Sequence, residues 1–169
     1  MVPSAYMQAM SAFVAQNMGA GRPDRAKKAL IGAISTSLAV GVILSYFSFF
    51  HGGLLAQLFA RDAAVIAAAA EYLKSYAVDC LLVSFLFCII GYFNGCGRTA
   101  FVMIQGIAGA FLVRISVSWM MSRVQPVSLF GVGLATPAST VVQLLLCAGY
   151  FVWMHHREKK MLAVPFVVE

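Results

Sequence analysis

Long uncharged runs of hydrophobic residues, separated by short polar breaks, make up most of this chain. The runs are long enough to cross a membrane as helices, because a span needs roughly 17–25 residues. The breaks hold glycine, proline and charged residues, which end helices and begin turns. Four runs therefore predict full spans, and a shorter run lies at the N-terminus. The predicted helices cover residues 3–18, 29–51, 63–95, 99–122 and 130–156.

Glycine, proline and one short apolar stretch refine this pattern. Gly19 and Gly21 supply a cap and a turn after the first helix, and Pro23 prevents its continuation. The apolar stretch 54–60 is too short to span and predicts an interfacial segment. Pro137 lies inside the last run, where a membrane helix tolerates it because neighbouring groups satisfy the carbonyl that it frees.

Composition places these helices in a membrane. Of the 169 residues, 62% are hydrophobic and 11% are charged, and the mean hydropathy is +0.87. A soluble domain is usually about 45–50% apolar and about 25% charged, so the excess is too large for a soluble core. We therefore predict an all-α polytopic membrane protein, with a single transmembrane helical domain over residues 1–169.

The sequence carries none of the common motifs for metal binding or catalysis. Its cysteines form no CxxC pair or Cys/His cluster, and its histidines lack acidic or cysteine partners at ligand spacing. No phosphate-binding loop, HExxH motif or Ser/His/Asp arrangement on a polar scaffold occurs. We therefore predict that the protein is not an enzyme, holds no metal and does not use ATP.

The net charge of +6 comes mainly from residues that flank the spans. No basic face lies outside these flanks, so we predict no nucleic-acid partner and assign the cations to membrane topology. The first loop, the turn before residue 99 and the C-terminal end lie on one side if five helices alternate. Lys and Arg are more frequent on that side, which predicts a cytoplasmic C-terminus. The cations are Arg22, Arg25, Lys27, Lys28, Arg98, Arg157, Lys159 and Lys160 on this side, and Arg61, Lys74 and Arg123 on the other.

Two charged residues, Asp79 and Arg114, lie deep within predicted spans. Charged side chains at bilayer depth are costly, so they usually face the interior of a bundle and have a partner. Counted from the turn at Arg98, they lie roughly 28 Å and 24 Å up antiparallel helices, at about 1.5 Å per residue. Contact across the hairpin is therefore possible. Three interpretations stay open: an ion pair that fixes helix register, a proton or Na⁺ site at Asp79 coupled to transport, and an Asp79 solvated near the outer helix end.

Small and polar residues inside the spans indicate how the helices pack. Gly91 and Gly95 form a GxxxG pair, which allows close approach of helices where lipid provides no hydrophobic driving force. The uncharged polar residues favour hydrogen bonding between helices, with substrate contact as the alternative. These residues are Gln16, Asn17, Asn94, Gln105, Ser116, Ser118, Ser139, Thr140 and Gln143.

SAFVAQNMGAG followed by RPDRAKKAL and, further along, DCLLVSFLFCIIGYFNGCGRT form an ordered set of motifs. In this order they resemble multidrug and toxic compound extrusion (MATE) transporters, and the resemblance is closest to bacterial members. The first stretch resembles the motif at the cytoplasmic end of the second helix in each half of that family. DCLLVSFLFCIIGYFNGCGRT resembles the tenth helix and its turn, and the stretches that follow resemble the eleventh and twelfth helices. The motif residues are Gln16, Asn17, Gly19, Gly21, Gly95, Gly97 and Arg98.

The resemblance implies a transporter of twelve helices in two six-helix lobes. Such a transporter exports cationic, amphipathic compounds across the cell membrane in exchange for H⁺ or Na⁺, and needs no cofactor besides that coupling ion. One bacterial branch uses a carboxylate of the tenth helix for coupling. Asp79 matches that position, with Arg114 as the candidate ion-pair partner. The implied location is the bacterial plasma membrane, as a multi-pass protein in contact with membrane lipid.

The resemblance covers only helices eight to twelve, which is an incomplete C-terminal lobe. The implied partners are therefore the missing N-terminal lobe and, in the complete protein, small cationic drugs. Two alternatives remain: a flippase for lipid-linked or polysaccharide substrates from the same superfamily, and a membrane module that acts by assembling with another subunit. The NMGAG and GCGRT motifs favour the drug-export branch. We expect no transport by this chain alone.

Overall fold

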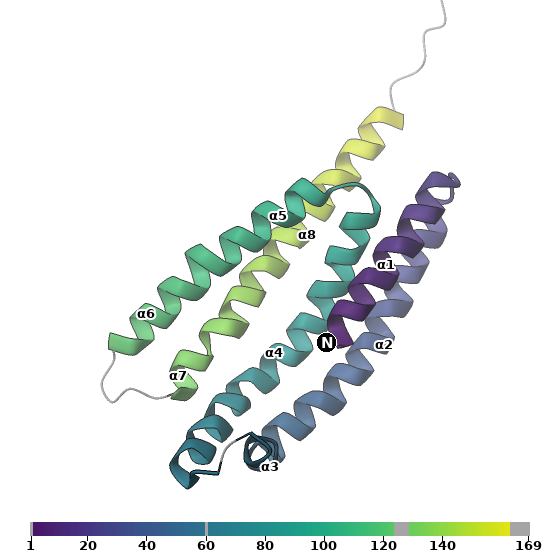
Figure 1. Cartoon of the computed structure of the whole chain (residues 1–169). Helices are drawn as coiled ribbons and strands as arrows, with labels where there is room; N and C mark the ends of the chain where they lie inside the picture. Colours follow the sequence, from purple (N-terminus) through teal and green to yellow (C-terminus); the bar gives the residue numbers. More distant parts are fainter. Residues whose placement is uncertain (1, 60, 124–128, 163–169) are drawn as a thin grey trace, which may run out of the picture.

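The computed structural model describes residues 2–59, 61–123 and 129–162, and every element within them is helical (Figure 1). The elements are α1 (Val2–Gly19), α2 (Pro23–Phe50), α3 (Gly52–Gln57), α4 (Ala63–Gly95), α5 (Thr99–Ile107), the π-helix η1 (Ala108–Ile115), α6 (Ser116–Arg123), α7 (Leu129–Gly133) and α8 (Ala135–Leu162). Helices α5, η1 and α6 follow one another without a break and form one long column. The predicted all-α class is confirmed.

Within the described residues, four helices are long and apolar enough to cross a membrane, in agreement with the predicted full spans. The fifth long helix, α1, has 18 residues and measures about 27 Å at 1.5 Å per residue, near the lower limit for a span. The short helix α3 lies at the predicted interfacial stretch. The four candidate spans are Pro23–Phe50, Ala63–Gly95, Thr99–Arg123 and Ala135–Met154.

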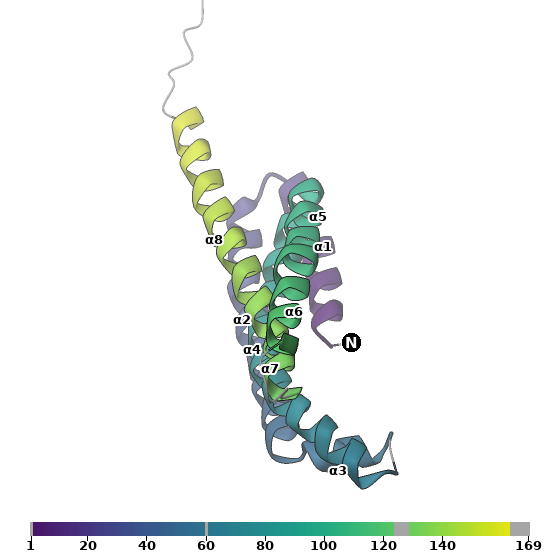
Figure 2. The same ribbon diagram turned by 90° about the vertical axis from the view of Figure 1, so that its left-hand side faces the viewer.

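Helix α4 lies at the centre of the bundle. It packs against α1 and α2 on one side and against α5, α7 and α8 on the other, and α3 contacts its beginning. The column of α5, η1 and α6 packs mainly on α8. Burial follows this arrangement, since 50% of the α4 span is buried but only 11% of the α2 span. Figure 2 shows that α3 and the beginning of α4 bend away from the bundle axis.

The GxxxG pair, for which the sequence predicts close helix approach, lies where α1 crosses α4. A Cβ atom at Gly91 would lie 2.6 Å from the carbonyl oxygen of Met7, and one at Gly95 would lie 2.5 Å from the Cβ of Val14. Cβ atoms do not approach other heavy atoms so closely, so a side chain at either position would push the helices apart. Val14 and Phe93 are fully buried beside this crossing and form part of the core.

Helix α2 begins earlier than the predicted range of 29–51. It starts at Pro23, whose fixed φ suits a first helical turn and whose missing N–H is not needed there. Asp24 follows in the first turn, where a carboxylate interacts favourably with the helix dipole. The exposed cations Arg25 and Lys28 therefore lie on a helical extension and not in a loop.

The last predicted helix, over residues 130–156, is divided in two. Helix α7 ends at Gly133 and α8 begins at Ala135. Pro137 therefore lies in the first turn of α8 and not in the interior of a helix. The N–H groups of a first turn have no acceptor within the helix, so the proline there removes no hydrogen bond.

The basic sites assigned to one side of the membrane lie at one end of the bundle (Figure 1). The α1–α2 turn, the α4–α5 turn and the C-terminal part of α8 are at the upper end, whereas α3, α7 and the end of α6 are at the lower end. The side chains of Arg157, Lys159 and Lys160 are outside the described part of the structure. The side of the membrane that the upper end faces stays a prediction.

Candidate functional site

Asp79 is buried between α4 and α8. Its side chain is 2% exposed, and its Oδ1 accepts a hydrogen bond of 2.6 Å from the hydroxyl of Thr140, which is also buried. Removal of a carboxylate from water is costly unless hydrogen bonds compensate it. The bond from Thr140 therefore stabilises Asp79 inside the bundle. One of the three interpretations of the sequence was an Asp79 that is solvated near the outer helix end. The burial of the side chain contradicts that interpretation.

Arg114 lies near the end of η1 and contacts the same face of α8. Its Nη2 donates a hydrogen bond of 3.1 Å to the hydroxyl oxygen of Thr136, and much of the side chain is exposed. In the described part of the chain, Asp79 and Arg114 each bond to a threonine and form no ion pair with one another. The hairpin geometry allows a direct contact between Asp79 and Arg114. In this structure both side chains bond to α8 instead.

Thr136 and Thr140 connect the two charged side chains. They are four residues apart, so they lie on one face of α8 and are separated by about 6 Å along its axis. The Thr140 hydroxyl is also 3.1 Å from the carbonyl oxygen of Thr136. Because a hydroxyl carries one hydrogen, it can donate either to Asp79 or to this carbonyl. Sequence reasoning missed Thr136, although the spacing of two threonines on a helix face was a usable signal.

The polar face of α8 continues to the π-helix. Ser139 donates a hydrogen bond of 2.8 Å to the carbonyl oxygen of Gly109, and the Nε2 of Gln143 donates one of 3.2 Å to Ser139. The side chain of Gln143 also fills the space that a Cβ at Gly109 would occupy. A side chain that binds a helix carbonyl can perturb regular helix geometry, and π-helical turns are frequent at functional sites. Hydrogen bonding between helices, predicted for Ser139 and Thr140, is confirmed.

The motif glycines Gly21 and Gly97 form two equivalent helix ends. Their φ angles are +68° and +73°, in the left-handed region that favours glycine. The N–H of Arg22 donates a 2.8 Å hydrogen bond to the carbonyl of Asn17, and a bond of the same pattern closes the turn at Gly97. This is the Schellman arrangement, which satisfies the last carbonyls of a helix. Both motifs therefore end helices.

The other motif residues lie at the basic end of the bundle and not beside Asp79. Gln16, Gly19 and Arg98 are exposed there. The Nδ2 of Asn17 donates a hydrogen bond of 2.8 Å to a carbonyl of its own helix. Arg98 lies roughly 28 Å from Asp79 along the helix direction, at about 1.5 Å per residue. The structure thus brings Asp79 and Arg114 toward one another and leaves the motif residues apart from them.

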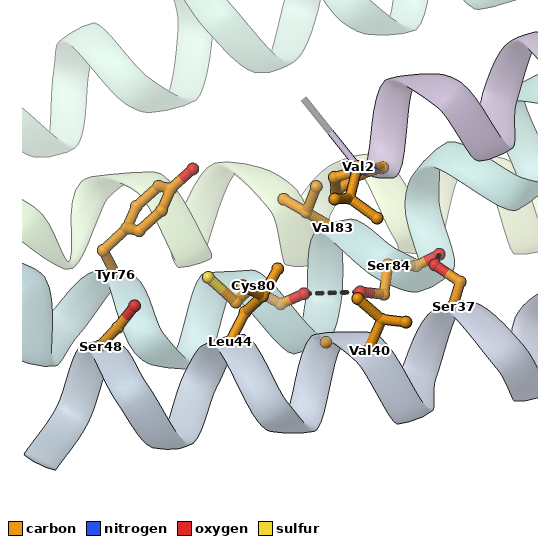
Figure 3. Close-up of a pocket in the computed structure, with 11 residues that line it drawn as sticks. Val2, Ser37, Val40, Leu44, Ser48, Tyr76, Cys80, Val83 and Ser84 are labelled. Atoms are coloured by element: carbon orange, nitrogen blue, oxygen red, sulfur yellow. Dashed lines mark hydrogen bonds between the residues drawn. The ribbon is translucent and has the colours of Figure 1, made fainter.

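A separate cavity of about 320 Å³ lies between α2, α4 and the beginning of α1 (Figure 3). Its described lining is mostly apolar, with Leu44 and Val83 among the larger side chains, and includes no charged side chain. Ser84 in its wall donates a hydrogen bond of 2.8 Å to the carbonyl of Cys80. Asp79 does not line this cavity, because its side chain is directed to α8.

The fold and the site define the class of the protein. In the described part of the chain four helices can cross a membrane, and one of them carries a buried carboxylate that is hydrogen-bonded to another. Arg114 bonds to the same face of that second helix. This is a polytopic helical membrane protein with a buried carboxylate in its interior, and charged residues at such depth often mark ion and substrate pathways. The family model of MatE matches residues 1–120, more than half of the chain, and the chain belongs to this family. The family predicted from the motifs is confirmed.

Three similar proteins come from Arabidopsis thaliana. Protein DETOXIFICATION 20 is 28% identical over 152 residues, which are 85% of this chain and 31% of that protein. Protein DETOXIFICATION 22 is 30% identical over 132 residues, which are 78% of this chain and 27% of that protein. Protein DETOXIFICATION 21 is 28% identical over 152 residues. The chain thus spans less than a third of the length of these relatives. No solved structure matches the chain significantly.

Proposed function

We propose that this chain is the C-terminal part of a cation-coupled transporter that exports cationic, amphipathic compounds. Membership of the MatE family and similarity to proteins named DETOXIFICATION support efflux of toxic compounds, and argue for a transporter and not an enzyme. The observation that carries the coupling role is the burial of Asp79, whose carboxylate is bonded to Thr140 inside the bundle. A buried carboxylate that gains and loses a cation can link ion movement to a change of conformation.

The coupling ion is H⁺ or Na⁺. A proton needs only the carboxylate of Asp79. A sodium ion needs several oxygen ligands, and the neighbouring oxygens include the hydroxyl of Thr140 and the carbonyl of Thr136, which lie 3.1 Å apart. Imposed gradients of each ion separate the two cases.

Further helices, in an N-terminal lobe, would complete the site. The relatives are more than three times as long as the matched segment, which supports this. The outer column also supports it, because only 11% of the Thr99–Arg123 span is buried. An exposed guanidinium such as that of Arg114 is costly against lipid, so polar groups or water should face it. The proposed location is the bacterial plasma membrane, with a cytoplasmic C-terminus.

The decisive experiment is cation-driven efflux by the complete transporter in proteoliposomes. We expect Asp79→Asn to lower transport driven by an imposed H⁺ or Na⁺ gradient at least tenfold, because the neutral amide binds neither ion well. The matched control is Asp24→Asn, which changes an exposed carboxylate in the first turn of α2 and should leave transport unchanged. Full coupled transport by the Asp79 variant would contradict the proposal. Vesicles that contain only this chain should show no efflux.

A further inference from the structure

We propose that Arg114 is a tethered competitor for the coupling cation at Asp79. When the cation leaves, the guanidinium moves from Thr136 to the carboxylate, and when a cation binds, the guanidinium returns to Thr136. This inference rests on the proposed coupling role of Asp79. It gives Arg114 a separate task, which is to weaken cation binding enough for release.

The two charged groups are attached to neighbouring points on one helix face. Asp79 is bonded to Thr140, and Arg114 is bonded to Thr136, one turn earlier in α8. That separation is about 6 Å along the helix axis. Arginine has a long side chain with several rotatable bonds, so changes of rotamer move its guanidinium over such a distance. The transfer therefore requires no movement of α8.

In the described part of the chain, the hydrogen bond of Arg114 is not made to a carboxylate. It goes to a neutral hydroxyl, and the side chain is largely exposed. A guanidinium carries five N–H donors and binds carboxylates with two parallel hydrogen bonds, which a threonine cannot offer. Asp79 without a cation is therefore the stronger partner, and Thr136 is the partner when the carboxylate is neutralised.

Thr140 can adjust to this exchange. Its hydroxyl lies within reach of two acceptors, Asp79 at 2.6 Å and the carbonyl of Thr136 at 3.1 Å. When a new partner occupies the carboxylate, the hydroxyl turns to the carbonyl and stays hydrogen-bonded. The charged neighbour that η1 brings to the site is Arg114, whereas α8 brings neutral threonines and α4 itself carries Tyr76 and Cys80 beside Asp79.

The first test measures how coupled transport by the complete transporter depends on the concentration of the coupling cation. Arg114→Gln removes the competitor, so we expect the half-saturating cation concentration to fall at least fivefold. We also expect maximal turnover to fall severalfold, because release of the cation becomes slow. Arg114→Lys keeps the charge but loses the paired N–H donors, so the half-saturating concentration should fall less than in Arg114→Gln. Arg123→Gln is the matched control, since that exposed arginine lies over the ring of Trp119 at the end of α6.

A second variant predicts a shift in the opposite direction. Thr136→Val removes the resting partner of Arg114, so the guanidinium spends more time at Asp79. We expect the half-saturating cation concentration to rise at least threefold, and this rise should disappear in the double variant with Arg114→Gln. Damage to the fold would lower the amount of active protein in both single variants, but would not shift the half-saturating concentration in opposite directions.

The outcomes separate this inference from the proposed function. If Asp79→Asn leaves coupled transport intact, the proposed function fails and this inference fails with it. If Asp79 is required but the half-saturating concentration is unchanged or higher in Arg114→Gln, only the role of Arg114 is overturned. The same conclusion follows if Thr136→Val lowers that concentration.

Discussion

At the scale of single residues, Asp79 depends on a hydroxyl group. A buried carboxylate is usually compensated by a cation, a metal or several N–H donors. Here the Thr140 hydroxyl, at 2.6 Å, supplies the hydrogen bond. The stability of the bundle should therefore depend on one oxygen atom of α8.

We expect Thr140→Val to destabilise the chain by about 1–3 kcal/mol, the usual cost of leaving a buried polar group without its partner. Valine keeps the volume of threonine and removes the hydroxyl. The midpoint of thermal unfolding in detergent measures the effect, and Thr140→Ser should restore most of the stability. The control is Thr36→Val, because that exposed threonine bonds a carbonyl of its own helix at 3.0 Å. A valine variant as stable as the wild type would contradict this role of Thr140.

At the scale of helices, the contact between α1 and α4 depends on the absence of side chains. The Cβ of an alanine at Gly95 would lie 2.5 Å from the Cβ of Val14 and 2.7 Å from the carbonyl oxygen of Ser11. The second neighbour belongs to the backbone of α1, so relief requires a shift of that helix. The helix pair is therefore more sensitive than a contact between flexible side chains.

Gly95→Ala should lower the stability of the chain by about 1–3 kcal/mol, the typical cost of an overpacked contact. The same thermal unfolding assay measures it. Gly32→Ala in α2 is the matched control, because nothing lies within 4 Å of its added Cβ and alanine favours the helix. Equal unfolding midpoints for the two variants would show that α1 does not pack on α4 as described.

The sequence could predict close helix packing at Gly91 and Gly95, because a GxxxG spacing is typical of it, but it did not identify α1 as the partner. It could also predict the spans, since long apolar runs define them. It did not predict the π-helix, because hydrophobicity along Ala108–Ile115 does not report hydrogen-bond register. That register is associated with the hydroxyl of Ser139 on another helix, which bonds the carbonyl of Gly109.

The sequence could also predict part of the candidate site, because positions along a helix follow from residue spacing. The depth of Asp79 and Arg114 follows from counting residues along two helices. Their partners depend on the rotation of α8, which cannot be obtained by counting residues in α4, α5 and η1. The link through Thr136 therefore follows only from the arrangement of α4, η1 and α8 in space.

At the scale of the whole molecule, α4 is the central element and the other long helices are peripheral. The α2 span and the Thr99–Arg123 span are each 11% buried, so most of their surface faces lipid or other helices. The α1–α2 turn, the α4–α5 turn and the C-terminal part of α8 lie at one end of the bundle (Figure 1). A membrane protein that follows the positive-inside rule should turn this end to the cytoplasm.

Labelling with a membrane-impermeant maleimide tests that orientation in the complete transporter. We expect Arg98→Cys, at the basic end, to react only after the cells are permeabilised. Phe59→Cys should react in intact cells, because Phe59 follows α3 at the opposite end and its side chain is 92% exposed. The native cysteines should be replaced first; Cys88 and Cys147 are buried, so alanine or serine there should be checked for folding. Labelling of both positions from the same side would contradict the fold, and the reverse pattern would place the basic end outside.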